Sequence, residues 1–172
     1  MSKAIFFDRD GVLNRAIVLN NRPFSPKNIK ELVINKFLKK TLLEAKKNFY
    51  LICITNQPEV GRNNFLEKDV EEINISIKNY FKLNDVFSCY HSKDNVCDCR
   101  KPKIGLILQA QKKYSINLKE SIVIGDRWKD ITMGKLAGCK TIFVDYNYDE
   151  NLIDKPDIRI NHLKELKKYV SI

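Results

Sequence analysis

The chain has 172 residues, a hydrophobic fraction of 44% and a formal net charge of +10, from 31 Lys+Arg against 21 Asp+Glu. These values suit one globular domain, which we take to span residues 1–172. No apolar stretch approaches the ~20 residues that a membrane span needs, and the start of the sequence does not resemble a signal peptide, so we expect a cytoplasmic protein. The positive charge favours anionic partners such as nucleic acids, anionic membranes or phosphorylated small molecules, although most lysines lie in helix-like stretches where they would simply face water.

Apolar runs alternate with amphipathic stretches along the chain. Five apolar runs are typical of buried strands: residues 3–7, 49–55, 85–90, 121–126 and 140–146. Five stretches have apolar residues at helical spacing: residues 35–48, with Asn35 as a candidate N-cap, then 66–83, 104–114, 129–138 and 162–170. Residues 12–30, which contain two prolines and several turn formers, are expected to form a loop. The alternation predicts an α/β fold, with a mainly parallel sheet flanked by helices on both faces.

Polar side chains follow three of these strands. Asp8 and Asp10 come directly after the first strand, Thr55 and Asn56 end the second, and Asp126 ends the fourth. In open parallel sheets, sites form beyond the carboxyl ends of the strands. The sequence therefore predicts one polar site at this edge of the sheet.

The spacing of Asp8 and Asp10 points to a metal-assisted reaction. Two carboxylates this close repel each other, and desolvation increases the repulsion. A divalent cation is the simplest compensation, and Mg²⁺ could take a carboxylate oxygen from Asp8 and from Asp126 and the backbone carbonyl of Asp10. Asp8 could then attack phosphorus to form an aspartyl-phosphate. Asp10 could protonate the leaving alkoxide and later deprotonate the hydrolytic water.

The cysteines indicate a second metal. An odd count of five argues against a disulfide framework in a cytosolic protein. Three of them cluster with a histidine as Cys89-x-His91 and Cys97-x-Cys99, a Cys₃His set that suits tetrahedral Zn²⁺. Because all four positions are filled by protein, the site would be structural and would fix the segment that begins at Arg100. A reactive thiol cluster is the alternative.

Four ordered segments carry a family resemblance. "DRDGVLN", "ITNQ", "RKPK" and "GDRWKD" resemble the four motifs of the haloacid dehalogenase (HAD) superfamily of phosphatases. More narrowly, "FDRDGVLN", "RPFSP", "TNQP", "CYHSKDNVCDCRKPK" and "GDRWKD" are similar to the zinc-containing D-glycero-D-manno-heptose-1,7-bisphosphate 7-phosphatase branch, and histidinol-phosphate phosphatase domains have a similar zinc loop. The resemblance covers nearly the whole chain and implies a Rossmann-like HAD fold with a zinc-binding loop. The spacing of the motifs leaves no room for a large cap domain.

The resemblance implies a role for each matching residue. Asp8 would be the nucleophile and Asp10 the general acid/base, and Asp126 would complete the Mg²⁺ site. Thr55 and Lys101 would stabilise the phosphoryl group, with Asp130 orienting the lysine or binding a metal-bound water. The expected substrate-binding residues are Asn56, Arg100 and Arg127.

Three details bear on this assignment. Lys103 is a rival for the lysine role, and we prefer Lys101 because the family's lysine immediately precedes the proline. Val12 stands where many superfamily members have threonine, and the heptose and histidinol branches also have an apolar residue there. Only five residues separate His91 from Cys97, fewer than in the better-known heptose enzymes. Because this loop borders the site, its shortening leaves the exact substrate open.

We therefore expect a Mg²⁺-dependent phosphatase that acts on a small sugar phosphate, with heptose 1,7-bisphosphate at its 7-phosphate as the first expectation. Histidinol phosphate and a polynucleotide end are the alternatives within the same chemistry. A non-catalytic, zinc-stabilised nucleic-acid-binding module would account for the zinc ligands and the charge but not for the three aspartates. Nucleic acid is not an expected partner, because no aromatic-rich basic stripe is present. We expect no membrane partner and a monomer.

Overall fold

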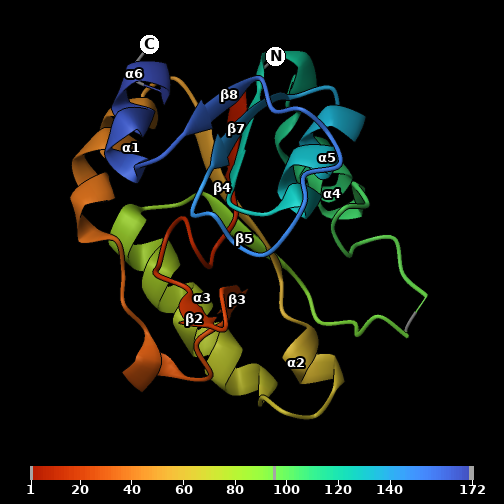
Figure 1. Cartoon of the computed structure of the whole chain (residues 1–172). Coiled ribbons are helices and arrows are strands. Elements are labelled where there is room, and N and C mark those ends of the chain that lie inside the picture. The colour runs from red at the N-terminus through yellow and green to blue at the C-terminus, as the bar shows by residue number, and fades with distance from the viewer. Residues whose placement is uncertain (1, 95, 171–172) are drawn as a thin grey trace.

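The computed structural model describes residues 2–94 and 96–170 and confirms the α/β fold. Within these residues, six strands form one parallel sheet in the order β5–β4–β1–β6–β7–β8 (Figure 1). The strands are β1 (Ala4–Phe7), β4 (Tyr50–Asn56), β5 (Asp85–Cys89), β6 (Ile122–Gly125), β7 (Lys140–Val144) and β8 (Ile158–Ile160). The helices are α1 (Lys39–Ala45), α2 (Pro58–Gly61), α3 (Glu67–Phe81), α4 (Gly105–Tyr114), α5 (Trp128–Leu136) and α6 (Lys167–Val170).

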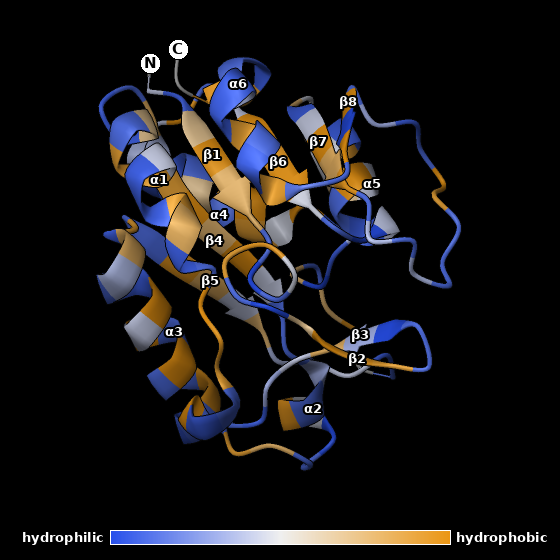
Figure 2. Ribbon diagram, turned by 60° about the vertical axis from the view of Figure 1, so that its left-hand side comes forward, coloured by the Kyte–Doolittle hydropathy of each residue, from blue (hydrophilic) through white to orange (hydrophobic). Residues whose placement is uncertain are grey.

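The sheet separates two hydrophobic cores, because successive residues of a strand face opposite sides. In β1, Ile5 and Phe7 pack in the core that α1 and α3 cover, whereas Ala4 and Phe6 pack in the core that α4 and α5 cover. All four side chains of β1 are buried, which explains why this strand is continuously apolar. Figure 2 shows the apolar strands in orange between helices that carry hydrophilic residues.

A β-hairpin occupies part of the segment that we predicted to be a loop. Strands β2 (Ile17–Leu19) and β3 (Arg22–Phe24) pair antiparallel. The turn between them consists of Asn20 and Asn21, with φ values of 48° and 56°. A two-residue hairpin turn of type I′ needs φ > 0 at both central residues, and asparagine tolerates this conformation better than most residues. Figures 1 and 2 both show the hairpin beyond the carboxyl end of the main sheet, near α2.

The other differences from the predicted elements concern short segments. The helix predicted over residues 35–48 is a 3₁₀ turn, Lys36–Leu38, followed by α1, and Asn35 makes no side-chain cap. The helix predicted over residues 162–170 is a 3₁₀ turn, Leu163–Leu166, followed by α6. Strand β8 and helix α2 were not predicted, because three or four residues are too few to show a periodicity. Among the described residues, no helix has both the length and the apolar character needed to cross a lipid bilayer.

Candidate active site

The carboxyl ends of β1 and β6 bring two of the predicted aspartates together. Asp8 directly follows β1, and its backbone N–H donates to the carbonyl of Ile124 in β6 at 2.9 Å. Asp126 directly follows β6. Gly11 has a φ of +97°, and a Cβ at this position would lie 1.9 Å from a carboxylate oxygen of Asp126. Glycine is therefore required where the loop after β1 passes over Asp126.

An acidic cluster forms the floor of the site. Asp8, Asp126 and Asp130 each offer a carboxylate oxygen, and these atoms lie within 4.8 Å of one another. The Lys101 Nζ lies 2.8 Å from Asp8 and 2.7 Å from Asp130, and it also donates to the carbonyl of Ile54 at 2.9 Å. One buried lysine thus pairs with two of the carboxylates. Asp126 has no ion-pair partner in the described part of the chain.

The single positive charge of Lys101 does not balance the three carboxylates of the acidic cluster, and a metal ion would supply further positive charge. Burial and the charge of Asp130 raise the pKa of Asp8 to about 7, despite Lys101. Burial and the charges of Asp8 and Asp130 raise the pKa of Asp126 well above its usual value. Both carboxylate oxygens of Asp126 are buried without a hydrogen-bond partner among the described residues. Because buried polar atoms normally have partners, this set of oxygen ligands fits a hard divalent cation such as Mg²⁺.

The carboxylate of Asp10, in contrast, is well supplied with hydrogen-bond donors. These donors are Arg9 (Nε 3.2 Å and Nη2 3.1 Å), Asn14 (Nδ2 3.0 Å), Ser25 (Oγ 2.8 Å) and Gln57 (Nε2 2.8 Å). Burial opposes the ionisation of Asp10, but the Arg9 guanidinium and the amide donors outweigh it, so the pKa of Asp10 lies below its ordinary value. The resting site therefore favours the ionised form of Asp10, which is the form that acts as a base.

Several of these supporting residues were missed by the sequence analysis. Arg9 is fully buried and donates to the Asn74 side chain of α3 at 2.9 Å, besides its bonds to Asp10. The sequence did offer one signal for a buried ion pair, because Arg9 stands directly between the two aspartates of "FFDRDG". Ser25 lies in "RPFSP" and Gln57 in "TNQP", two segments that carried the family resemblance, but nothing in their spacing indicated that both donate to Asp10.

The residues at the end of β4 hold the predicted lysine in place. The Asn56 side chain accepts a hydrogen bond from the Lys101 backbone N–H at 3.0 Å and donates to the Lys101 carbonyl at 3.2 Å. Thr55 is buried, and its hydroxyl accepts a hydrogen bond from Gln57 at 2.8 Å. The Lys103 ammonium points elsewhere, to the carbonyl of Cys97 and to the exposed carboxylate of Asp98 at 3.5 Å. The geometry thus favours Lys101 over Lys103 as the phosphate-binding lysine.

A cavity of about 520 Å³ lies over the acidic cluster, and its lining includes Asp8, Asp10, Lys101, Arg100 and Arg127. The two predicted substrate-binding arginines differ in their partners. The Arg127 guanidinium pairs with the Glu150 carboxylate through two hydrogen bonds. Arg100 donates to the backbone carbonyl of His91 at 2.9 Å. Arg127 is therefore already neutralised, whereas Arg100 has no carboxylate partner in the described residues.

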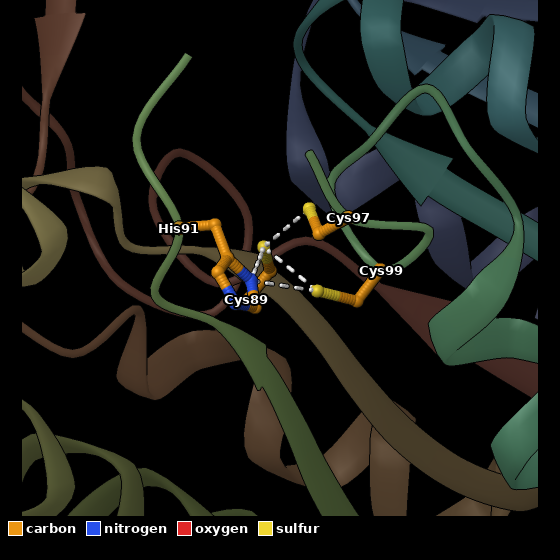
Figure 3. Close-up of side chains that lie close together, drawn as sticks. All are labelled: Cys89, His91, Cys97 and Cys99. Atoms are coloured by element: carbon orange, nitrogen blue, oxygen red, sulfur yellow. Dashed lines mark hydrogen bonds between the residues drawn. The ribbon is translucent and has the colours of Figure 1, made fainter. Parts of the chain in front are cut away.

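The predicted metal ligands of the cysteine loop also converge (Figure 3). One ligand atom from each of Cys89, His91, Cys97 and Cys99 lies within 4.8 Å of the others. The Cys89–Cys99 sulfurs are 3.1 Å apart, and the His91 Nδ1 lies 3.2 Å from the Cys99 sulfur. Two sulfur ligands of a tetrahedral Zn²⁺ are about 3.8 Å apart, so the cluster is compatible with zinc after a small adjustment. All five cysteines are free, and burial raises the pKa of Cys89 to about 12, so a cation would be needed to keep this sulfur as a thiolate.

Comparisons with known proteins identify relatives of this chain. A HAD-hydrolase-like family model matches residues 98–166. D-glycero-beta-D-manno-heptose-1,7-bisphosphate 7-phosphatase of Helicobacter pylori strain J99 is 33% identical over 98% of this chain and 97% of its own length. The corresponding alpha-anomer enzyme of Photorhabdus laumondii is 32% identical over 83% of this chain and 81% of its own length. The histidine biosynthesis bifunctional protein HisB of Baumannia cicadellinicola is 29% identical over 99% of this chain and 47% of its own length.

A solved structure supports the fold. The D,D-heptose 1,7-bisphosphate phosphatase from B. bronchiseptica, complexed with magnesium and phosphate, superposes with a TM-score of 0.79 over 96% of each chain at 21% sequence identity. At that identity the likeness shows the fold alone, but the curated relatives above 30% identity extend over most of the chain. The chain therefore belongs to the HAD-type phosphatases, which are phosphoric monoester hydrolases, and is related to the D-glycero-D-manno-heptose-1,7-bisphosphate 7-phosphatases and to the HisB phosphatase domain.

Proposed function

We propose that this phosphatase removes the 7-phosphate of D-glycero-D-manno-heptose 1,7-bisphosphate, with Asp8 as the nucleophile, Mg²⁺ in the acidic cluster and a structural Zn²⁺ in the Cys/His cluster. The observation that carries the chemistry is the placement of Asp8 in the lining of the cavity, with the Lys101 ammonium 2.8 Å away and the unpartnered carboxylate of Asp126 within 4.8 Å. The names of the relatives with over 30% identity support the choice of substrate. Family membership leaves no support for a non-catalytic nucleic-acid-binding module.

The reaction proceeds in two displacements. The negative charge of the bound substrate favours the protonated form of Asp10. An Asp8 carboxylate oxygen then attacks phosphorus, the ester P–O bond breaks, and the protonated Asp10 gives its proton to the leaving alkoxide. Asp10 then takes a proton from a water molecule, the hydroxide attacks the phosphorus of the aspartyl-phosphate, and the bond to Asp8 breaks to release inorganic phosphate. Lys101, which already contacts Asp8, faces the negative charge on the phosphoryl oxygens. When bound by Asp8, Asp126 and the Asp10 carbonyl, Mg²⁺ supplies further positive charge for those oxygens.

The zinc site would act on catalysis through the chain that follows it. Lys101 lies two residues after Cys99, and Arg100 donates to the carbonyl of His91. A metal ion that ties Cys99 to Cys89 at the end of β5 would hold Lys101 and Arg100 over the cavity.

A phosphate-release panel tests the proposal. It contains both anomers of heptose 1,7-bisphosphate, heptose 7-phosphate, other sugar phosphates, histidinol phosphate and a phosphorylated oligonucleotide, each with and without Mg²⁺. We expect kcat/KM for one heptose bisphosphate anomer to exceed that of every other compound by at least about tenfold, with heptose 1-phosphate as the product in NMR spectra. Asp8→Asn is nearly isosteric and should be inactive with an unchanged circular dichroism spectrum.

Histidinol phosphate is the second candidate substrate, because the HisB protein matches 99% of this chain. That match covers only 47% of HisB, a bifunctional protein. A higher kcat/KM for histidinol phosphate than for either heptose bisphosphate would replace the first candidate with this one. A protein that releases no phosphate from any compound in Mg²⁺ would contradict both.

A further inference from the structure

The cations that line the cavity fall into two groups. The first group consists of cations with carboxylate partners within 4.0 Å: Arg22 with Asp149, Arg62 with Glu59, Lys101 with Asp8 and Asp130, and Arg127 with Glu150. The second group consists of Lys93, Arg100 and Lys129, which line the same cavity but have no ion-pair partner in residues 2–94 and 96–170. The carboxylates that pair with cations in this cavity thus pair with the first group, and the three cations of the second group are not neutralised within the described part of the chain.

The three unpaired cations come from two segments of the chain that both line the cavity. Lys93 and Arg100 belong to the Cys/His loop, and Lys129 lies in the first turn of α5. The Lys129 Nζ rests 5.5 Å from the centroid of the Trp128 ring. Burial, and then the charges of Arg127, Arg100 and Lys93, lower the pKa of Lys129, which shows that these cations are close enough to repel one another.

Such an arrangement is unfavourable without an anion. The first turn of a helix carries a partial positive charge, so a lysine there adds to an existing excess, whereas an anion is stabilised. Phosphate is an anion that guanidinium and ammonium groups both bind in proteins. The acidic cluster takes the phosphate that is hydrolysed, so the unpaired cations are left for another one. A cavity of about 520 Å³ falls in the usual range of roughly 300–1,000 Å³ for small-molecule sites, so a sugar with a phosphate at each end can reach both places.

We infer that Lys93 and Lys129 form a subsite that binds the second phosphate of the substrate beside Arg100, which the family resemblance already implies as a substrate-binding residue, and that these two lysines make the enzyme prefer a bisphosphate to the corresponding monophosphate. The inference rests on the proposed function, since it assigns the hydrolysed phosphate to the acidic cluster. It does not depend on which sugar joins the two phosphates. Arg127 is outside the subsite, because Glu150 already neutralises it.

The test compares KM for two substrates that differ only in the distal phosphate, heptose 1,7-bisphosphate and heptose 7-phosphate. Lys129→Gln and Lys93→Gln should each raise KM for the bisphosphate about tenfold and leave KM for the monophosphate within about twofold, with little change in kcat, because a charge-assisted contact to one phosphate is lost. Added salt should narrow the difference between wild type and variants. Arg62→Gln is the matched control: it removes a cation from the same cavity, but one that is paired with Glu59, and its KM values should match those of wild type.

Two results separate this inference from the proposed function. Equal changes in KM for both substrates, or no change for the bisphosphate, would overturn the subsite even if heptose bisphosphate is the true substrate. If wild type does not turn over heptose bisphosphate, the proposed function fails, and the same variants are measured with fructose 1,6-bisphosphate and fructose 6-phosphate. Calorimetric titration of the Asp8→Asn protein with the bisphosphate supplies a readout without turnover: Lys129→Gln should weaken binding about tenfold, and unchanged binding would refute the subsite.

Discussion

Metal-free enzyme should become less stable as pH rises through neutrality, and Mg²⁺ should remove this dependence. The pKa of Asp8 is 3.8 in an unfolded chain and about 7 in the folded one. The folded state therefore binds more protons than the unfolded state in this range, so the free energy of unfolding falls with pH. Between pH 6 and pH 8, Asp8 alone lowers the free energy of unfolding by on the order of 1 kcal/mol. The raised pKa of Asp126 acts in the same direction.

Other carboxylates do not disturb this window. The pKa values of Asp10, Asp85 and Asp157 are lowered, so the stability that they contribute is gained as pH rises through about 4 and is complete well below pH 6. Mg²⁺ binds the ionised carboxylates and should stabilise the enzyme increasingly from pH 6 to pH 8. The effect of the acidic cluster should therefore be isolated in this range.

Urea unfolding at pH 6, 7 and 8 measures the effect, in buffers with and without millimolar Mg²⁺. Free Mg²⁺ is removed by dialysis rather than with a chelator, so that zinc stays bound. Asp126→Asn should make the metal-free enzyme more stable than wild type at pH 8 and should abolish the response to Mg²⁺, because it removes one of the repelling charges. Asp149→Asn changes an exposed carboxylate outside the cluster and should behave like wild type. A metal-free stability that is the same at pH 6 and pH 8, or a strongly destabilised Asp126→Asn, would refute this reasoning.

Further predictions concern the supports of the site. Lys101→Met should reduce kcat about 10²–10³-fold. It should also lower the free energy of unfolding, measured with urea, by about 3–5 kcal/mol, because it leaves buried carboxylates unpaired. Adding Asp130→Asn should recover the stability but not the activity. Cys97→Ser should lower the zinc content, measured by atomic emission, from about one per chain and raise KM, while the far-UV circular dichroism of the sheet persists; full zinc and activity would contradict the site. Asn74→Ala removes the acceptor of the buried Arg9 and should cost about 1–3 kcal/mol of unfolding free energy; an unchanged midpoint would show that the bond is not needed.

The meeting of Asp8 and Asp126 could be predicted because it follows from a rule about sheets. Residues at the carboxyl ends of neighbouring parallel strands lie at one edge, and the apolar runs before both aspartates were long enough to be recognised as strands. The sulfur and imidazole ligands of Cys89, His91, Cys97 and Cys99 could be predicted for another reason: ligand type and spacing are local properties of the sequence.

The partners of the site residues could not be predicted, because they come from segments without a periodic pattern. Arg127 pairs with Glu150 across a loop of irregular structure, and no pattern in the sequence indicated this partner. Ser25 reaches Asp10 only because the hairpin folds back over the site, and the hairpin depends on two asparagines with positive φ rather than on a recognisable turn sequence. Non-local hydrogen bonds of this kind are determined by tertiary packing, which single-sequence patterns do not contain.

Two sets of contacts hold Lys101 in position. On one side, the Asn56 side chain holds the Lys101 backbone through both its amide atoms. On the other, the Cys/His cluster connects Cys99 to the end of β5, where the Cys89 carbonyl also accepts the Gln57 N–H at 2.7 Å. Both sets of contacts attach to the ends of β4 and β5. The core under α1 and α3 contains none of the zinc ligands, whereas Cys89 is buried in the core under α4 and α5, so one of the two cores that stabilise the strands does not depend on zinc. Loss of zinc should therefore misplace the lysine while the sheet stays folded, so that catalysis fails before the fold does.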